Sequence, residues 1–562
     1  MTAIDDFFTH YYARRPVNAT FTGVHAYDEE LPDWSPRGLD ALDDEIRSLG
    51  SALEKAYPAP ASAAALRNNP DLLDAELARA YLEVQRAENA SMHGPRGNPA
   101  LWTGETIFSI IALMIREFAP LRDRIEVAEA RLSKFSSSLN PSVGDPPTRA
   151  PRAWKEKALR DRDGAEILMT TGVITWLTCA ELPVSQRDRF YRTAASAQAR
   201  VRSFMAHVDG AQPDAPESAM SCGPDLFDLL LNRGHFCTRS RADLLTEAKN
   251  RFESARADLD TLARSVAGSW PDAQVQIAAD HPTPDEYHSA FEKTWQACHE
   301  HAERANVVAW PDNWPIRYVS YPAWTADAAP HLYYLHYRSP APFDPVGTYD
   351  YVVPALPTEP ERAEQHLRVW NNSTIKLNHV VHHGAIGHHV QNWYAYNQQR
   401  SRAGNVAGVD CANRIGMFLG GTMTEGWACY ATDLMEELGF LTPLERVSQQ
   451  HTRVRMLARA IVDIELHQGT MSFADAVRFY EEQVRMSGEA AKAEAVKNSM
   501  FPCTAIMYWL GTQGIHDLRD EMKRREGPRF SLRRFHGELL GYGSIPVPLV
   551  ARMMTGSAPL SG

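Results

Sequence analysis

Apolar residues recur at helical spacing through most of this chain, with charged residues between them. Residues 71–88 are a clear example, because their apolar residues fall on one stripe of a helix and their charges on the opposite face. Ser240 is suited to cap a helix that begins after it, and Pro284 and Glu286 after Thr283 form the signature of a capping box. These patterns predict a mainly α-helical protein.

Short segments rich in valine and tyrosine occur in one region, at 316–321, 331–337 and 349–356. They predict one small antiparallel sheet lining a cleft, just before a histidine-rich segment, where a sheet edge can pair with an extended peptide. Loops are predicted near 141–152, 209–224 and 338–347, which are rich in proline, glycine, serine and aspartate.

The chain has no internal repeat and no long low-complexity linker. We therefore expect a single large helical domain over residues 1–562. Within it, residues of about 1–300 would form one lobe and residues of about 301–562 a second lobe that carries the active site.

Composition narrows the classes of partner. The 562 residues are 44% hydrophobic and 23% charged with a net charge of -12, which is ordinary for a globular protein and gives no reason to expect nucleic acid or a membrane as partner. No secretory signal and no apolar run of membrane-spanning length are found. The seven cysteines are far apart and never form C-x-x-C, which indicates reduced thiols in the cytoplasm and argues against a cysteine-based zinc site.

The segment "NHVVHHGAIGHHVQNW" (378–393) holds five histidines. Ser373 or Thr374 would cap a helix on which His379 and His383 share a face, and His382 and His389 share another. A zinc site needs imidazoles about one turn apart, a third ligand and an open position, and a zinc hydrolase also needs a carboxylate base, as in H-E-x-x-H. That motif is absent here. Spacing alone leaves a metal site and a polar helix facing a wet cleft as open alternatives.

Two further segments offer polar groups. Glu425 stands early in the helix-like segment 422–440, where it is either a metal ligand or an acid that complements the helix dipole. Arg459, Asp463 and His467 recur every four residues, so they form either a relay that holds a ligand or a ladder of ion pairs along one helix.

These motifs, in this order, resemble the large bacterial family known as domain of unknown function 885. "PVNATFTGVHAYDEELPDWS" is similar to the family's opening segment, and "HHGAIGHHVQ" and "EGWACY" stand where the family has H-E-x-x-P-G-H-H and E-G-W-A-x-Y. "RAIVDIELH", "FPCTAIMYWLG" and "FHGELLGYGSIPVPLV" resemble the family's later segments. The resemblance therefore spans nearly the whole chain.

The resemblance implies a zinc metallopeptidase-like protein with a multi-helical, gluzincin-like body similar to the carboxypeptidase Taq family and a central cleft. It implies His382, either His388 or His389, and Glu425 as zinc ligands. It places Tyr508 and His536 near the substrate. It places Asp463 and His467 behind the zinc ligands, and Arg459 lies on the same helix stripe as these two residues.

The sequence also departs from the family pattern. His383 stands where the family has its glutamate, Ile386 replaces a proline, Cys503 and Thr504 replace Gly-Gln, and Gly537 replaces an aspartate. Three hypotheses follow: a zinc-dependent peptidase that acts on short peptides with His383 as its base; a pseudo-peptidase that binds a peptide or small molecule, with or without metal; and a changed chemistry that uses His379 or Cys503. The sequence does not fix the oligomeric state.

Overall fold

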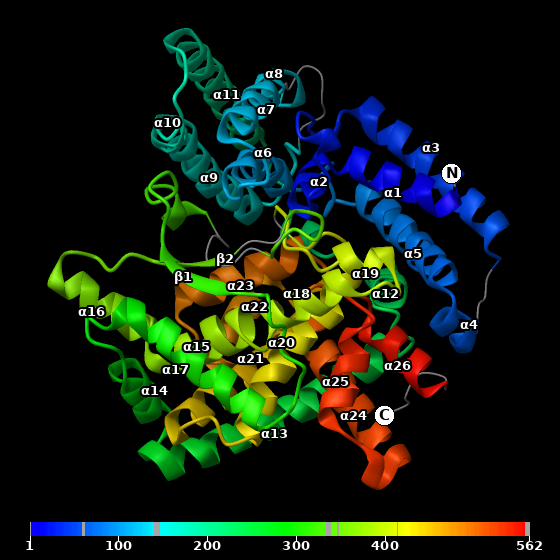
Figure 1. Ribbon diagram of the computed structural model, residues 1–562, viewed down its shortest axis with the longest axis vertical. Helices are drawn as coiled ribbons and strands as arrows, with labels where there is room; N and C mark the ends of the chain where they lie inside the picture. Colours follow the sequence, from blue (N-terminus) through cyan, green and yellow to red (C-terminus); the bar gives the residue numbers. More distant parts are fainter. Residues whose placement is uncertain are drawn as a thin grey trace.

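The computed structural model describes residues 2–58, 62–139, 147–332, 339–345, 348–412 and 414–556, and most of them lie in helices (Figure 1). The amphipathic segment 71–88 is helix α5 (Pro70–Ala90), and Ser240 caps α13 (Arg241–Ala267) by accepting a hydrogen bond from the backbone N–H of Asp243. The predicted mainly α-helical class is confirmed.

The first half of the chain supplies two groups of helices in the upper part of Figure 1. They are α1 (Ala3–Arg14), α2 (Pro16–Thr22), α3 (Pro36–Ala56), α4 (Ala63–Asn68) and α5, and then α6 (Pro99–Met114), α7 (Leu121–Ser133), α8 (Phe135–Ser138), α9 (Arg152–Ile167), α10 (Val173–Thr178) and α11 (Val184–Gly210). The loop predicted at 209–224 lies between α11 and α12 (Pro224–Leu229) and contains one 3-10 turn.

The lower body of Figure 1 holds the rest of the chain. Its helices are α13, α14 (Trp270–Ala279), α15 (Tyr287–Arg304), α16 (Pro360–Val369), α17 (Asn372–Thr374), η6 (Ile375–Gly384), α18 (His388–Asn397), α19 (Arg402–Val406), α20 (Gly421–Glu437), α21 (Pro443–His467), α22 (Phe473–Gln483), α23 (Gly488–Met500), α24 (Ile506–Glu526), α25 (Leu532–Leu540) and α26 (Val547–Thr555). Helix α15 begins three residues later than its capping box predicts. Residues 283–286 instead form a turn, in which the backbone N–H of Glu286 donates to the Thr283 carbonyl and the Thr283 hydroxyl donates to the Glu286 carboxylate.

The sheet has two described strands, β1 (Ile316–Ser320) and β2 (Tyr349–Val353), and they run parallel with Ile316 opposite Tyr349. The predicted antiparallel pairing is wrong. A two-residue hairpin would reverse the chain, whereas the long connection from 321 to 348 returns it to the same end of the sheet. Most of the predicted strand at 331–337 lies outside the described residues.

The sheet lies against the histidine segment, as predicted. The Tyr351 hydroxyl of β2 is hydrogen-bonded to Nδ1 of His379, and a side chain at Gly384 would collide with the Tyr318 hydroxyl of β1.

One continuous apolar core runs from Ile4 to Met554. Helix α13 packs on α21, where the Lys249 ammonium pairs with Glu465 and the Gln450 amide donates to the carbonyl of Ala255. Helix α13, which precedes position 300, therefore belongs to the lower body of Figure 1. No helix in the described part of the chain is both long and apolar enough to cross a membrane.

Helices α20 and α24 cross with their backbones in contact. A Cβ built on Gly511 would lie 2.0 Å from the carbonyl oxygen of Thr422, and one built on Gly426 would lie 2.5 Å from the backbone of Gly511. Only glycines allow so close a crossing. The crossing places Glu425, the neighbour of Gly426, beside α24. Tyr508 lies on α24, one turn before Gly511.

Candidate metal centre

The histidine segment is a π-helix, η6, rather than an α-helix. Its cap is Asn371, whose side chain accepts the backbone N–H of Thr374, so the predicted caps Ser373 and Thr374 are wrong. In a π-helix each residue bonds five positions back, so consecutive residues turn through a smaller angle than in an α-helix. Two neighbouring histidines can then face the same space.

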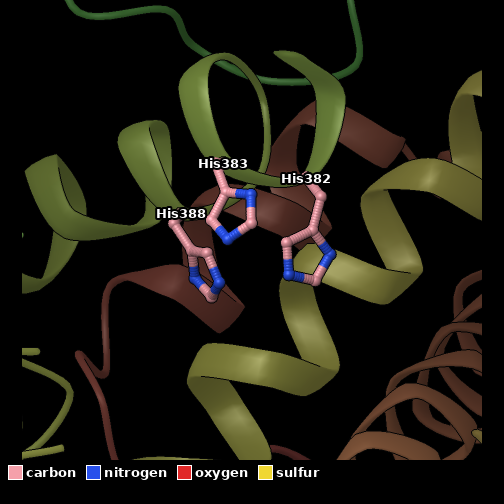
Figure 2. A group of neighbouring side chains, drawn as sticks. All are labelled: His382, His383 and His388. Carbon is pink, nitrogen blue, oxygen red and sulfur yellow. The ribbon is translucent and has the colours of Figure 1, made fainter. Parts of the chain in front are cut away.

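Figure 2 shows three histidine rings turned toward one another, His382 and His383 from the end of η6 and His388 from the start of α18. One ring nitrogen from each lies within 4.8 Å of the others. His382 and His383 are half-buried and His388 is buried.

Glu425 reaches this group from α20. Its Oε2 atom lies 3.5 Å from Nε2 of His382 and 3.6 Å from Nε2 of His388, and its side chain is 16% exposed. Burial opposes ionisation of the Glu425 carboxyl, but hydrogen bonds and charge from the two histidines outweigh it and hold the pKa well below its usual range. Glu425 and His382 therefore meet from two different helices, as predicted.

His383 is held in one tautomer. Its Nδ1 lies 2.6 Å from the carbonyl oxygen of Asn378, so Nδ1–H donates and Nε2 keeps its lone pair. Burial, together with the neighbouring His382 and His388, lowers the pKa of the ring well below its ordinary value. A backbone carbonyl that fixes one nitrogen and presents the other is the usual support of a metal-binding histidine.

The group fits a zinc ion. Two ligands at tetrahedral zinc, with bonds of about 2.0–2.1 Å, lie about 3.3 Å apart, close to the 3.5 and 3.6 Å between Glu425 and its two histidines. Nδ1 of His388 is buried without a hydrogen bond in the described residues, whereas its Nε2 lies 3.6 Å from Glu425.

His389 and His379 do not join the group. Nε2–H of His389 donates to the carbonyl of Trp314 at 2.9 Å, and burial lowers the pKa of the ring to about 4. His379 is stacked on Trp370, with ring centroids 4.1 Å apart, and bonds Tyr351. Of the two alternatives His388 and His389, the structure places His388 beside Glu425.

The stripe of Arg459, Asp463 and His467 forms neither a relay to a ligand histidine nor a full ladder of ion pairs. Nε of Arg459 donates to Glu494 at 2.7 Å, and His467 donates to the carbonyl of Asn498 at 2.9 Å. Only Asp463 and His467 approach each other, at 3.6 Å.

Asp463 instead holds the start of α24. Its carboxylate accepts the backbone N–H groups of Cys503 at 3.0 Å and Ile506 at 2.9 Å. Burial raises the pKa of the Asp463 carboxyl to about 7, although these N–H groups oppose the rise. Because Tyr508 stands two residues after Ile506, Asp463 fixes the position of Tyr508.

Tyr508 and His536 differ in setting. The Arg459 guanidinium lies over the aromatic ring of Tyr508, and its central carbon is 4.9 Å from the ring centroid. His536 is fully buried, with one ring nitrogen on the carbonyl of Val307 at 2.6 Å and the other on the Tyr430 hydroxyl at 2.9 Å. Both nitrogens are thus engaged within the protein, and burial lowers the pKa of the ring to about 4.

Sequence reasoning missed Arg455. It stands one turn before Arg459 on α21, and its charge helps to lower the pKa of His382, after the larger effects of burial and His388. Extending the four-residue stripe backward from Arg459 finds this residue.

Residues 16–554 match the model of a family described as "Bacterial protein of unknown function (DUF885)". A "putative lipoprotein of unknown function" from Shewanella oneidensis is similar at 18% identity over 98% of this chain and 99% of its own, with a TM-score of 0.75. A "putative lipoprotein" from Colwellia psychrerythraea is similar at 15% identity over 99% of both chains, with a TM-score of 0.78. These likenesses show a shared fold. No curated protein matches the chain.

Proposed function

Since the chain belongs to the DUF885 family of bacterial proteins of unknown function, we propose from its own residues that it binds one zinc ion through His382, His388 and Glu425 and acts as a weak peptidase on short peptides. The observation that carries the proposal is the approach of two histidine Nε2 atoms to one Glu425 oxygen, at 3.5 and 3.6 Å. Two imidazoles and one carboxylate are the donor set of many zinc hydrolases.

Zinc in such a site lowers the pKa of a bound water and polarises a peptide carbonyl. Glu425 supplies negative charge, and His382 and His388 fix the position of that charge. Nε2 of His383 faces the same space and, in a neutral ring, can accept a proton. A carboxylate at this position would be anionic and drawn toward the cation, so a histidine is the poorer base. Weak turnover is therefore expected.

A second candidate function is a pseudo-peptidase, and the position of His383 favours it. Its Nε2 belongs to the same group as the nitrogens of His382 and His388, so three histidines and Glu425 can supply four donors. A zinc ion with four protein ligands has no open position and resembles a structural site. Such a protein would bind a peptide or small molecule without cleaving it.

The cleft, the carboxypeptidase-Taq-like character of the fold, the cytoplasmic location and a role of Tyr508 beside the substrate belong to this proposal. Tyr508 is supported by the α20–α24 crossing, which brings its helix to Glu425. His536 is supported by no such contact.

Zinc titration of protein without a histidine tag tests the proposal. One ion per chain is expected for the wild type, and Glu425→Gln, which keeps the side-chain shape, should weaken binding by about 100-fold or more through loss of an anionic ligand. His288→Ala, at an exposed histidine on α15, is the matched control and should bind as the wild type does. Absence of zinc binding, or equal binding by the Glu425→Gln variant, would refute the metal centre.

Turnover separates the two candidate functions. Zinc-loaded wild type is incubated with a mixed pool of short peptides, and new amino termini are counted. Slow cleavage that Glu425→Gln abolishes supports the peptidase. One bound zinc with no cleavage above the Glu425→Gln background supports the pseudo-peptidase.

A further inference from the structure

A short link joins the two helices that carry the histidines of the proposed metal centre. It consists of residues 385–387, between the end of η6 and the start of α18. The ψ angles of Ala385 and Gly387 are -116° and -121°, outside the helical range. Gly387 has no room for a side chain, because a Cβ there would lie 1.9 Å from the carbonyl oxygen of His382. The path of this link therefore decides how His388 faces His382.

Two tryptophans from other helices donate hydrogen bonds to the backbone at this link. Nε1–H of Trp295, on α15, donates to the carbonyl of Gly384 at 2.8 Å. Nε1–H of Trp427, on α20, donates to the carbonyl of Ile386 at 2.9 Å. Trp427 is fully buried, so its N–H finds no water in place of that carbonyl and the bond is costly to break. Since Trp427 stands two residues after Glu425, α20 supplies the carboxylate and also holds the link.

A reciprocal pair of hydrogen bonds fixes the start of α18, directly after the link. Nε1–H of Trp314 donates to the carbonyl of His389 at 2.9 Å, and Nε2–H of His389 donates to the carbonyl of Trp314 at 2.9 Å. This pair fixes the rotation of α18 about its axis. His388, the neighbour of His389, then faces Glu425.

The Trp427 ring is itself supported by His536. The two rings meet edge to face, with their centroids 5.2 Å apart. His536 is held by the Tyr430 hydroxyl at 2.9 Å and by the carbonyl of Val307 at 2.6 Å. These contacts connect His536 to the link through Trp427.

We propose that Trp427 and Trp295 are positioning residues of the proposed metal centre, whose N–H groups hold the link so that His388 stands opposite His382 before an ion binds. The inference rests on the proposed function, because the site that they position is the proposed zinc site. An indole N–H is only a donor, so neither tryptophan is itself a ligand. Replacing a residue that orients metal ligands typically lowers metal affinity about 10–100-fold.

Zinc affinity of folded variants tests the inference without turnover. Trp295→Phe removes one donor and keeps an aromatic ring. Replacement of Trp427 by benzothienylalanine, which has sulfur in place of the indole N–H, removes the other donor and keeps the shape. Zinc titration of each variant should give a dissociation constant about 10–100-fold higher than that of the wild type. Trp102→Phe is the matched control and should bind zinc as the wild type does, because Trp102 on α6 donates to a backbone carbonyl outside the link, that of Pro95, at 2.8 Å.

Two further measurements separate positioning from a general loss of stability. The visible spectrum of Co²⁺-loaded protein reports the geometry of the ligands, so it should change in the two link variants and not in Trp102→Phe. Amide hydrogen exchange of zinc-free protein, read by mass spectrometry, reports the link itself, since the N–H of Gly387 donates to the carbonyl of Val381 at 2.9 Å. Exchange there should be about tenfold faster in both variants, the scale of one lost hydrogen bond.

The outcomes distinguish the inference from the proposed function. If the wild type binds zinc and both link variants keep its affinity, the positioning role is refuted and the zinc site stands. An equal loss of affinity in Trp102→Phe would also overturn the inference, because the effect would then be one of stability. If the wild type binds no zinc but exchange at the link is faster in both variants, the proposed function fails and the hold of the tryptophans on the link stands.

Discussion

His383→Glu is the substitution that most directly tests the chemistry of the metal centre. It places a carboxylate where the wild type has an imidazole whose Nδ1 is tied to Asn378 and whose Nε2 faces His382 and His388. A carboxylate there is anionic at neutral pH and can take a proton from a bound water. The change also removes one of the three histidine nitrogen donors, so a zinc ion held by His382, His388 and Glu425 would keep an open position.

Two magnitudes follow. A positioned general base contributes about 10²–10⁴-fold in rate, so kcat/KM on peptides should rise by about that factor. Without zinc, the new carboxylate would join the group that Glu425 also faces, and two like charges about 5 Å apart repel by about 3 kcal/mol at an effective dielectric constant of about 20. The zinc-free variant should therefore be less stable than the wild type by up to about 3 kcal/mol, and zinc should remove the difference.

The assay compares wild type, His383→Glu and His383→Gln, each zinc-loaded, on a mixed peptide pool, with urea unfolding before and after zinc removal. The glutamine variant has the length of glutamate without its charge, so it should show neither the gain in rate nor the loss of zinc-free stability. If the wild type cleaves peptides readily and the glutamate variant is slower, His383 is a working catalytic residue and the reasoning fails. Equal gains in the glutamate and glutamine variants would show that opening the site, rather than adding a base, is what matters.

Three other outcomes are expected from the fold. Burial opposes protonation of His25, but ion pairs with Asp28 and Asp344 outweigh it and raise its pKa to about 9, so the stability that this ring adds should be full below about pH 6.5 and lost as the pH rises through about 9. Because the ring is 31% exposed, solvent screening reduces its contribution to the free energy of unfolding to about 1–2 kcal/mol. Urea unfolding of wild type and His25→Gln measures this contribution. A difference between the two that does not shrink from pH 6 to pH 10 would contradict it. Cys503 has a φ of +59°, in the left-handed region that favours glycine. Cys503→Gly should therefore be more stable than Cys503→Ala by about 1 kcal/mol, because both variants lose the sulfur but only glycine relieves the left-handed backbone. Equal free energies of unfolding for the two variants would rule out backbone strain at this position. Gly511→Ala should destabilise the protein by about 3 kcal/mol because its Cβ meets the Thr422 carbonyl, whereas Gly50→Ala, with nothing within 4 Å, should stabilise it by about 0.5–1 kcal/mol; similar thermal midpoints for the two variants would disprove the close crossing.

The sequence predicts the helices well because their periodicity is local. The stripe in α5 and the cap at Ser240 depend on residues within a few positions of one another, and both are found. The relative direction of the two strands is harder to predict from the sequence, because it depends on the course of the long connection between them rather than on the composition of either strand.

The sequence names the residues of the proposed metal centre but not their geometry. The resemblance supplies His382 and Glu425, which meet at 3.5 Å. The choice between His388 and His389 depends on the phase of α18 after the irregular backbone at Ala385 and Gly387, and one residue turns a helix by about 100°. Nothing in the residue types of η6 signals bonding five positions back, so the shared orientation of His382 and His383 could not be foreseen.

The π-helix changes how this segment should be compared between relatives. Each of its turns holds more residues than an α-helical turn, so loss of a single residue between Ile375 and the histidines would let the chain return to α-helical bonding. His382 and His383 would then rotate away from Glu425 although neither had been replaced. A sequence alignment that scores only the identity of the histidines would count such a relative as intact. For this stretch, a one-residue gap is therefore as informative about the proposed metal centre as a substitution of His382.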